Sequence, residues 1–247
     1  ALKMIKPTHV YHCAGTLSRG TAEVDDRESV LINEIGAKNI VDALLEIKDT
    51  NPVEACVMLG TSMEYGLTPD ILKEDVVCDP VGSYAVAKHN ATQYMQETAR
   101  RHELPIISLR VFTRDGPGMH QNSLIAKTCK NALEGTNIIL SDPSVTRDFI
   151  YIDDLIAMML ELVPVAKQYC GEVFNAGSGV ATQLDTYIAT VLQQSNSKSV
   201  IIWDSQYKSA YDERLWKADM TKTFTTLSWS PSVPLPEGIA NIMRHQM

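Results

Sequence analysis

The sequence predicts an α/β fold in which a Rossmann-like, doubly wound parallel sheet is joined to a smaller carboxyl-terminal α/β lobe. Apolar, β-branched runs alternate with segments of helical periodicity from the first residues onward. The helical segments are long enough to cross over a sheet, which favours parallel strands with both sheet faces covered. In folds of this kind, ligands bind at the carboxyl ends of the strands.

The first five elements show this alternation most clearly. Residues 8–14 (THVYHCA) form a short apolar run that ends in small residues, and residues 54–60 (EACVMLG) and 105–112 (PIISLRVF) have the composition of buried strands. Between these strands, residues 30–47 carry apolar side chains at helical spacing, and residues 84–101 are rich in alanine and glutamine. One helix therefore separates each strand from the next.

The alternation continues with shorter elements in the second half. We expect helices over residues 124–133, 154–163 and 183–194, and strands over 137–140, 172–175 and 200–203. Glycines and prolines interrupt this rhythm after residue 112, and Pro234 and Pro236 suit a surface connection. We predict a dinucleotide-binding domain of residues 1–112 and about 146–179, and a substrate-binding lobe of about 113–145 and 180–247.

The composition excludes several classes of protein. The 247 residues carry 22 Lys and Arg against 30 Asp and Glu, a net charge of −8, which argues against binding to nucleic acid or to an anionic membrane surface. No apolar run approaches the roughly 20 residues of a membrane span. Five widely spaced cysteines without a Cys-x-x-Cys pair favour buried thiols in a reducing cytoplasm over a zinc site or disulfides.

A Tyr-x-x-x-Lys pair, Tyr84 and Lys88, opens one of the predicted helices. This spacing puts both side chains on one helix face, one turn apart. The tyrosine pKa of about 10 falls beside an ammonium group, and such a tyrosine can exchange a proton with a substrate hydroxyl during hydride transfer. A hydroxyl of Thr61 or Ser62, at the end of the preceding strand, can hold the substrate oxygen. By itself, a helical Tyr–Lys pair is more often part of a solvated face.

Together with further segments, this pair resembles the extended short-chain dehydrogenase/reductases, and among them the NAD-dependent epimerase/dehydratase family that acts on nucleotide sugars. The resemblance extends in order along nearly the whole chain. It rests on 12–15 (HCAG), 33–39 (NEIGAKN), 61–66 (TSMEYG), Tyr84 with Lys88, 110–118 (RVFTRDGPG), 147–154 (RDFIYIDD), 174–179 (FNAGSG), and 218–219 (AD) with 227–231 (LSWSP).

In this family, roughly 60 residues with a Gly-rich turn come before the strand that residues 7–14 resemble. The sequence contains no Gly-x-Gly-x-x-Gly and no Gly-x-x-Gly-x-x-Gly, so the resemblance implies a Rossmann domain truncated at its amino terminus. We expect either part of a longer polypeptide or a short chain that binds no dinucleotide. The residue that determines the preference for NAD or NADP normally lies in the same segment. The cofactor is therefore expected to be NAD or NADP.

The resemblance implies catalytic roles for three residues. Thr61 would hydrogen-bond the sugar, Tyr84 would be the acid/base, and Lys88 would bind the nicotinamide ribose and tune Tyr84. Arg147 would meet the nucleotide diphosphate, which suits the fork of a guanidinium group. From the residues alone, an ion pair of Arg147 with Asp153 or Asp154 is an alternative.

The resemblance also implies further binding residues. Ala14, Gly15, Asn33 and Val111, besides Tyr84 and Lys88, would contact the cofactor, and Ser62, Met63 and Thr113 would contact the substrate. From the residues alone, Ala14 and Gly15 fit a tight strand end equally well, and Asn33 fits a solvated helix face.

Two departures from the family restrict the reaction. Family dehydratases carry an acid where this chain has Met63, which cannot donate a proton, so dehydration is not expected. Glu64 is one residue further on, and on a strand this shift points its side chain to the opposite face; we expect it at the surface or in a buried polar role. Thr113 replaces a family Asn, which leaves the identity of the sugar open.

We therefore expect an NAD(P)-dependent enzyme that oxidises or reduces carbon 4 of a nucleotide-linked hexose, as a 4-epimerase or a 4-ketoreductase. The alternatives are a non-catalytic dinucleotide-binding regulatory subunit on the same fold and a nucleotide-sugar dehydratase. The family also implies a homodimer in which the helices at 30–47 and 84–101 form a four-helix bundle. Close approach of these helices would depend on Ala85, Ala87, Ala91 and Ala99.

Overall fold

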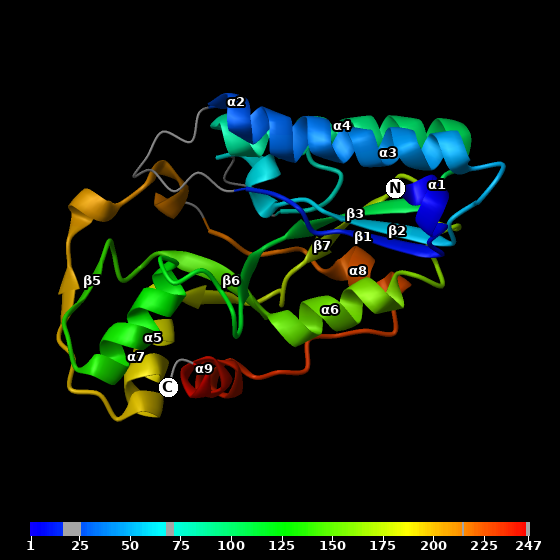
Figure 1. Ribbon diagram of the computed structural model, residues 1–247. Coiled ribbons are helices and arrows are strands. Elements are labelled where there is room, and N and C mark those ends of the chain that lie inside the picture. The colour runs from blue at the N-terminus through cyan, green and yellow to red at the C-terminus, as the bar shows by residue number, and fades with distance from the viewer. Residues whose placement is uncertain (17–25, 68–71, 214, 246–247) are drawn as a thin grey trace.

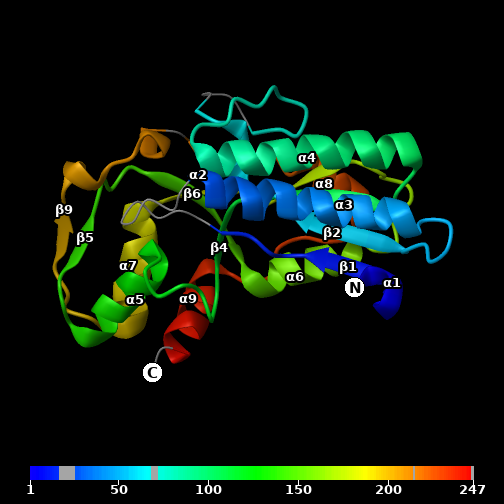
Figure 2. The ribbon, with the colours of Figure 1, turned by 45° about the horizontal axis from the view of Figure 1, so that its top comes forward.

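The computed structural model describes residues 1–16, 26–67, 72–213 and 215–245 of the chain. In this part of the chain a parallel sheet lies between layers of helices, with a smaller lobe beside it (Figures 1 and 2). The predicted α/β class is confirmed. None of the helices in the described ranges has the length and apolar character that crossing a bilayer requires.

Four parallel strands form the central sheet in the order β1-β2-β3-β7. Tyr11 of β1 and Ile107 of β3 both lie opposite Val57 of β2, so the register is continuous across the three strands. All residues of β3 are buried, as expected of a strand covered on both faces. The strands are β1 (His9–His12), β2 (Ala55–Leu59), β3 (Ile106–Val111) and β7 (Val173–Ala176).

Helices cover both faces of this sheet. Figure 1 shows α3 (Gly36–Ile47) and α4 (Ser83–His102) over one face, and α6 (Ile152–Glu161) and α8 (Thr221–Thr226) over the other. A π-helical segment, Val30–Ile35, joins α3 to the short α2 (Asp26–Ser29). The predicted helix at 30–47 is therefore one turn longer than expected and contains a change of helical pitch.

The alanines of α4 pack inside the chain. Ala85, Ala87, Ala91 and Ala99 are at most 6% exposed, and Ala91 and Ala99 belong to the core beneath α3 and α4. The expectation that these four residues line a contact between two chains is therefore wrong. Their small side chains instead let α4 lie close to its own sheet and to the π-helical segment.

The smaller lobe has a hydrophobic core of its own. This core is enclosed by α5 (Leu124–Glu134), α7 (Leu184–Ser195) and α9 (Leu235–Arg244), and β5 (Ile138–Leu140) pairs in parallel with β9 (Ile201–Trp203) at its edge. A third sheet has the order β4-β6-β8 and consists of β4 (Thr113–Asp115), β6 (Thr146–Tyr151) and β8 (Ala181–Gln183).

The predicted helices and strands are all present, and apart from the helix at 30–47 their ends differ from the prediction by at most two residues. The elements that the sequence patterns did not predict include β4, β6 and β8, which are short or polar, and the helices α8 and α9. The segment with Pro234 and Pro236 is not wholly a surface connection, because Pro236 lies in the first turn of α9, where a missing N–H costs nothing. Residues 216–229 contribute Trp216 and Trp229 to the core beside the central sheet; the division into two domains stays a prediction.

The cysteines divide into three groups: Cys56 and Cys129 are buried, Cys78 and Cys170 are partly buried, and Cys13 is exposed. Cys56 and Cys129 are fully buried, and burial raises the pKa of both thiols to about 12. The prediction of buried thiols holds for these two residues. It is wrong for Cys13, which is exposed because the chain leaves the sheet at the end of β1.

Candidate active site

A cavity of about 510 Å³ lies at the carboxyl ends of β1, β2 and β3. Four of the predicted site residues line it together: Gly15, Tyr84, Lys88 and Val111. Gly15 follows the end of β1, Val111 ends β3, and Tyr84 and Lys88 lie in the first turns of α4, so the parallel sheet is what gathers them. The remaining walls are mostly apolar and come from α6 and from the ends of the strands.

A single turn of 3-10 helix, Ser62–Tyr65, follows β2 and orients Thr61. Thr61 is the N-cap of this turn: its hydroxyl accepts a hydrogen bond from the Met63 N–H at 3.3 Å, and its own N–H donates to Glu64 Oε1 at 2.9 Å. The two bonds form a capping box. The Thr61 side chain is 8% exposed and lies within hydrogen-bonding reach of Tyr84.

Glu64 is not on a strand. The alternation of side chains along a strand therefore does not decide where Glu64 points, contrary to the expectation. The chain turns into a 3-10 helix directly after Gly60, and the Glu64 side chain points into the protein with no exposure to solvent. Its Oε2 accepts a hydrogen bond from Arg110 Nε at 3.3 Å, and its Oε1 accepts the Thr61 N–H. The expected buried polar role is correct, and a carboxylate held in this way has no free oxygen to offer a substrate.

Tyr84 and Lys88 lie one turn apart at the start of α4, as predicted. Lys88 Nζ donates a hydrogen bond to the carbonyl oxygen of Leu59 at 2.9 Å, which fixes the ammonium group at the end of β2. Burial raises the pKa of Tyr84 above its ordinary value, whereas Thr61 and Arg114 act to lower it. The expected fall in the Tyr84 pKa is therefore absent in the chain alone, and the strongest charge that favours its phenolate is that of Arg114 rather than Lys88.

Asn33 braces the loop that follows β1. It is 1% exposed, its Oδ1 accepts the Thr16 N–H at 3.0 Å, and its Nδ2 donates to the Thr16 carbonyl at 2.9 Å. Asn33 is thus not on a solvated face, and it acts on the cavity by holding the adjacent backbone. A Cβ on Gly15 would lie 3.0 Å from Asn33 Oδ1 and 3.1 Å from Lys88 Nζ, so a larger residue there would disturb both side chains.

A second cavity of about 550 Å³ adjoins the first and is lined by Thr113 and Arg147. Arg147 does not pair with Asp153 or Asp154 as the alternative had it. Its guanidinium group forms an ion pair with Asp212, which lies in a short 3-10 helix, Ala210–Glu213. Asp154 instead accepts hydrogen bonds from the N–H and hydroxyl of Ser232 at 2.9 and 2.8 Å.

Five predicted residues line neither cavity: Thr61 and Asn33, described above, and Ala14, Ser62 and Met63. Ala14 is exposed beside Gly15, Ser62 is 8% exposed within the 3-10 turn, and Met63 is partly exposed next to it. Their contacts with cofactor or substrate stay predictions.

Arg114 lines both cavities, and the sequence did not predict this residue as part of the site. Arg114 lies within the segment 110–118 that carries the resemblance, but at a position that the family pattern leaves unspecified. Its position depends on the packing of β4 against β6 and α6, which no local pattern shows.

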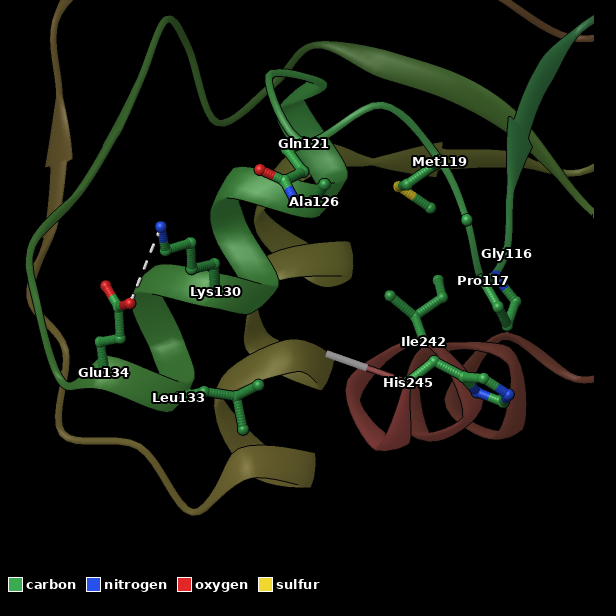
Figure 3. Close-up of a pocket in the computed structure, with 11 residues that line it drawn as sticks. Gly116, Pro117, Met119, Gln121, Ala126, Lys130, Leu133, Glu134, Ile242 and His245 are labelled. Atoms are coloured by element: carbon green, nitrogen blue, oxygen red, sulfur yellow. Dashed lines mark ion pairs between the residues drawn. The ribbon is translucent and has the colours of Figure 1, made fainter. Parts of the chain in front are cut away.

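Figure 3 shows a third cavity, of about 380 Å³, between the loop at 116–121 and the helices α5 and α9. None of the predicted site residues lines it. Its ion pair, between Lys130 and Glu134 at 3.8 Å, joins two neighbours on α5 and is exposed to solvent. Tyr84 and Lys88 line the first cavity, and Thr113 and Arg147 line the second, so these two cavities are the candidate site.

Residues 1–177 match the model of a family described as the NAD dependent epimerase/dehydratase family. Among curated proteins, the chain is 22% identical over 246 residues to a GDP-6-deoxy-D-mannose reductase of Pseudomonas aeruginosa, an alignment covering 96% of this chain and 79% of the relative. It is 25% identical over 260 residues to UDP-glucuronate 4-epimerase 5 of Arabidopsis thaliana, covering 97% of this chain and 58% of the relative.

Among solved structures, the chain is similar to a UDP-glucuronic acid 4-epimerase of Bacillus cereus in complex with UDP-glucuronic acid and NAD. The TM-score is 0.86 at 25% identity, and the match covers 99% of this chain and 76% of the other. The fold is also shared with a Pseudomonas aeruginosa protein complexed with NADPH, at a TM-score of 0.84 and 20% identity, covering 96% of this chain and 80% of the other.

Proposed function

The chain belongs to the NAD-dependent epimerase/dehydratase family, and from this premise we propose that it is an NAD(P)-dependent enzyme acting at carbon 4 of a nucleotide-linked hexose, as a 4-epimerase or a 4-ketoreductase. The observation that carries the proposal is the meeting of Thr61, Tyr84 and Lys88 at the end of the central sheet, beside a cavity. The relatives, which include 4-epimerases and a reductase of nucleotide sugars, support the same reaction class.

In the proposed reaction, Tyr84 exchanges a proton with the oxygen on carbon 4. Burial keeps the Tyr84 pKa above its ordinary value, so the phenol is protonated near neutral pH and is ready to donate a proton to a keto sugar. In the oxidising direction Tyr84 must lose this proton first, and the positive charge of Arg114 favours that loss. Thr61, held by its capping box, would position the sugar oxygen next to Tyr84.

The first cavity fits the nicotinamide end of a dinucleotide. Gly15 leaves its backbone open to close approach, and Lys88 presents an ammonium group on the same wall. Such a cofactor, when bound, accepts or returns a hydride. The matched structures with NAD and NADPH support NAD or NADP as the cofactor.

The second cavity fits the nucleotide end of the substrate. Arg147 would bind the diphosphate, and Thr113, the first residue of β4, lines the same cavity. Because Arg147 is paired with Asp212 in the chain alone, binding of a diphosphate would require this carboxylate to move aside.

Dehydration is the weaker candidate, because neither nearby side chain can serve as the acid. Met63 has no proton to give, and both oxygens of Glu64 are engaged inside the protein. A non-catalytic subunit is weaker still, since such a protein has no need for Thr61, Tyr84 and Lys88 together.

The test is incubation of the full-length protein with NAD and gluco- or manno-configured nucleotide hexoses. We expect either equilibration of the carbon 4 epimers without added NADPH, which identifies an epimerase, or reduction of a supplied 4-keto-6-deoxy sugar with NAD(P)H. Accumulation of a 4-keto-6-deoxy product from the hexose would contradict the assignment of Met63 and identify a dehydratase.

Tyr84→Phe is the matched variant for the same assay. It should lower turnover by about 10²–10⁴-fold, the usual contribution of general acid–base catalysis. Tyr94→Phe makes the same change on the same helix, at a hydroxyl that donates to Asp42 near the surface, and should leave turnover within about threefold of the parent. Equal activity of all three proteins would remove Tyr84 from the mechanism.

The proposal includes a homodimer and a cytoplasmic location. The outward face of the π-helical segment and α3 exposes Val30, Leu31 and Ile35 by 37%, 55% and 39%, which supports pairing through this face. All five cysteines are free, which supports a reducing compartment.

A further inference from the structure

Arg114 stands at the junction of the two cavities. Only Arg114 and Ile152 line both of them among the described residues. Arg114 is therefore placed between the end that holds Tyr84 and Lys88 and the end that holds Arg147. If the nucleotide lies at Arg147 and the reacting carbon at Tyr84, the sugar ring between them must pass this guanidinium group.

The charge of Arg114 is not matched within the described residues. Arg110 is paired with Glu64, Arg147 with Asp212, and Lys88 donates to a carbonyl oxygen, whereas Arg114 makes no hydrogen bond or ion pair with any residue in the described ranges. Asp115 is the single acidic residue among the described walls of the two cavities, and its side chain is 4% exposed and accepts a hydrogen bond from Tyr187 instead. In a protein of net charge −8, this junction is locally positive.

We propose that Arg114 binds a carboxylate on the sugar and makes the enzyme selective for nucleotide hexuronates over neutral nucleotide hexoses. This inference rests on the proposed function. A carboxylate on carbon 5 would form a charged, bidentate hydrogen bond with the planar guanidinium fork. A neutral hydroxymethyl group at the same carbon would leave the arginine facing water.

The electrostatics of the site agree with this placement. Arg114 contributes to the environment of Tyr84 and of Lys88, where its charge acts to lower the pKa of both groups, so the guanidinium group lies within range of the proposed acid/base end. A diphosphate also binds arginine, but the second cavity already has Arg147 for that role, and Arg147 does not line the cavity that holds Tyr84.

The test compares three ligands by titration calorimetry on the full-length protein: UDP-glucuronate, UDP-glucose and UDP. GDP-mannuronate, GDP-mannose and GDP form the matching series for a guanosine-selective protein. We expect the parent protein to bind the hexuronate at least about tenfold more tightly than the hexose. Arg114→Met should weaken hexuronate binding by about 10- to 100-fold, the loss of one charged hydrogen bond. It should change binding of the hexose and the free nucleotide by less than about threefold.

Two further variants keep the result interpretable. Arg114→Lys retains the charge without the bidentate fork and should recover part of the hexuronate affinity. Arg101→Met makes the same arginine-to-methionine change at an exposed site near the end of α4. It should leave the affinities for all ligands unaltered.

The outcomes separate the inference from the proposed function. Equal affinity of the parent for hexuronate and hexose would overturn the inference and leave the proposed function standing. An equal loss for all three ligands in Arg114→Met would also overturn it, because the arginine would then bind the diphosphate. Binding of none of the nucleotides by the parent protein would overturn the proposed function and the inference together.

Discussion

Arg110 Nε lies 3.3 Å from Glu64 Oε2, and neither side chain is more than 4% exposed. This pair joins β3 to the 3-10 turn that carries Thr61, and it is extended by His89 of α4, whose Nδ1 lies 3.9 Å from the same carboxylate oxygen. Cys78 and Glu64 raise the pKa of His89 to about 9, so this imidazole is also positively charged near neutral pH. One buried carboxylate thus ties together the elements that position Thr61 and Tyr84.

Glu64→Gln should therefore destabilise the protein strongly. The substitution leaves the Arg110 charge buried without its partner, a loss that typically costs about 3–5 kcal/mol in the free energy of unfolding. Chemical denaturation is the measurement. Glu46→Gln is the matched control, because its ion pair with Lys3 is more than 60% exposed on both sides and should contribute less than about 1 kcal/mol. Similar losses of unfolding free energy in the two variants would show that the buried ion pair contributes no more to stability than the exposed pair.

Removal of a positive charge near Tyr84 should shift the pH dependence of sugar oxidation. The reaction in this direction needs the phenolate, and Arg114 acts to lower the Tyr84 pKa. Arg114→Met should therefore raise that pKa and move the rise in rate to higher pH. Lys88→Ala should produce a smaller shift and also weaken cofactor binding, measured by NADH fluorescence. Unchanged pH–rate profiles in both variants would show that the titrating group is not Tyr84.

Arg147 and Asp212 should have opposite effects on substrate binding. Arg147→Ala should raise KM for a nucleotide sugar more than it lowers kcat, because a charged hydrogen bond to a diphosphate is worth about 1.5–3 kcal/mol. Asp212→Asn should lower KM, since the carboxylate competes with the diphosphate for the same guanidinium group. Steady-state kinetics measures both effects. A higher KM in both variants would mean that the ion pair has a structural role only.

Asp115 should make the protein less stable as the pH rises. Burial raises the pKa of this carboxyl group from 3.8 to about 7 in the folded chain. Between these values the folded state binds more protons than the unfolded state, so stability is greatest below about pH 4 for this group and falls as the pH rises through 7. The difference between the two pKa values corresponds to at most about 4 kcal/mol in the free energy of unfolding.

Asp115→Asn isolates this contribution from those of other titrating groups. Urea midpoints of the parent and the variant, measured at pH 5 and pH 8, should show that the variant gains stability relative to the parent at the higher pH. A difference between the two proteins that does not change with pH would contradict the assignment.

The proposed dimer should depend on the outward face of the π-helical segment. Leu31→Glu and Ile35→Glu place charges on the exposed apolar residues there and should give monomers at micromolar concentration by sedimentation. Ile139→Glu, at a 52% exposed position on β5 in the other lobe, is the control and should remain dimeric. A monomeric parent protein would remove the dimer from the proposal.

The sequence by itself determined the order and type of the main elements, because these depend on local patterns. Apolar runs of strand length and the helical spacing of 30–47 specify their secondary structure within one segment, and Tyr84 and Lys88 share a helix face through their spacing alone. The carboxyl ends of parallel strands lie at the same edge of the sheet, which is why Gly15, Tyr84, Lys88 and Val111 line one cavity.

Only the tertiary structure decided the partners of the charged groups. Glu64 and Arg110 are 46 residues apart in the sequence, and Arg147 and Asp212 are 65 apart, so no local pattern links either pair. The turn after Gly60 also changed the direction of Glu64, which a strand pattern could not anticipate. Arg114 acquired its position between two cavities in the same way, through the packing of β4 against β6 and α6. Such ion pairs depend on distances between chain segments, and these distances are set by the packing of the whole fold rather than by neighbouring residues.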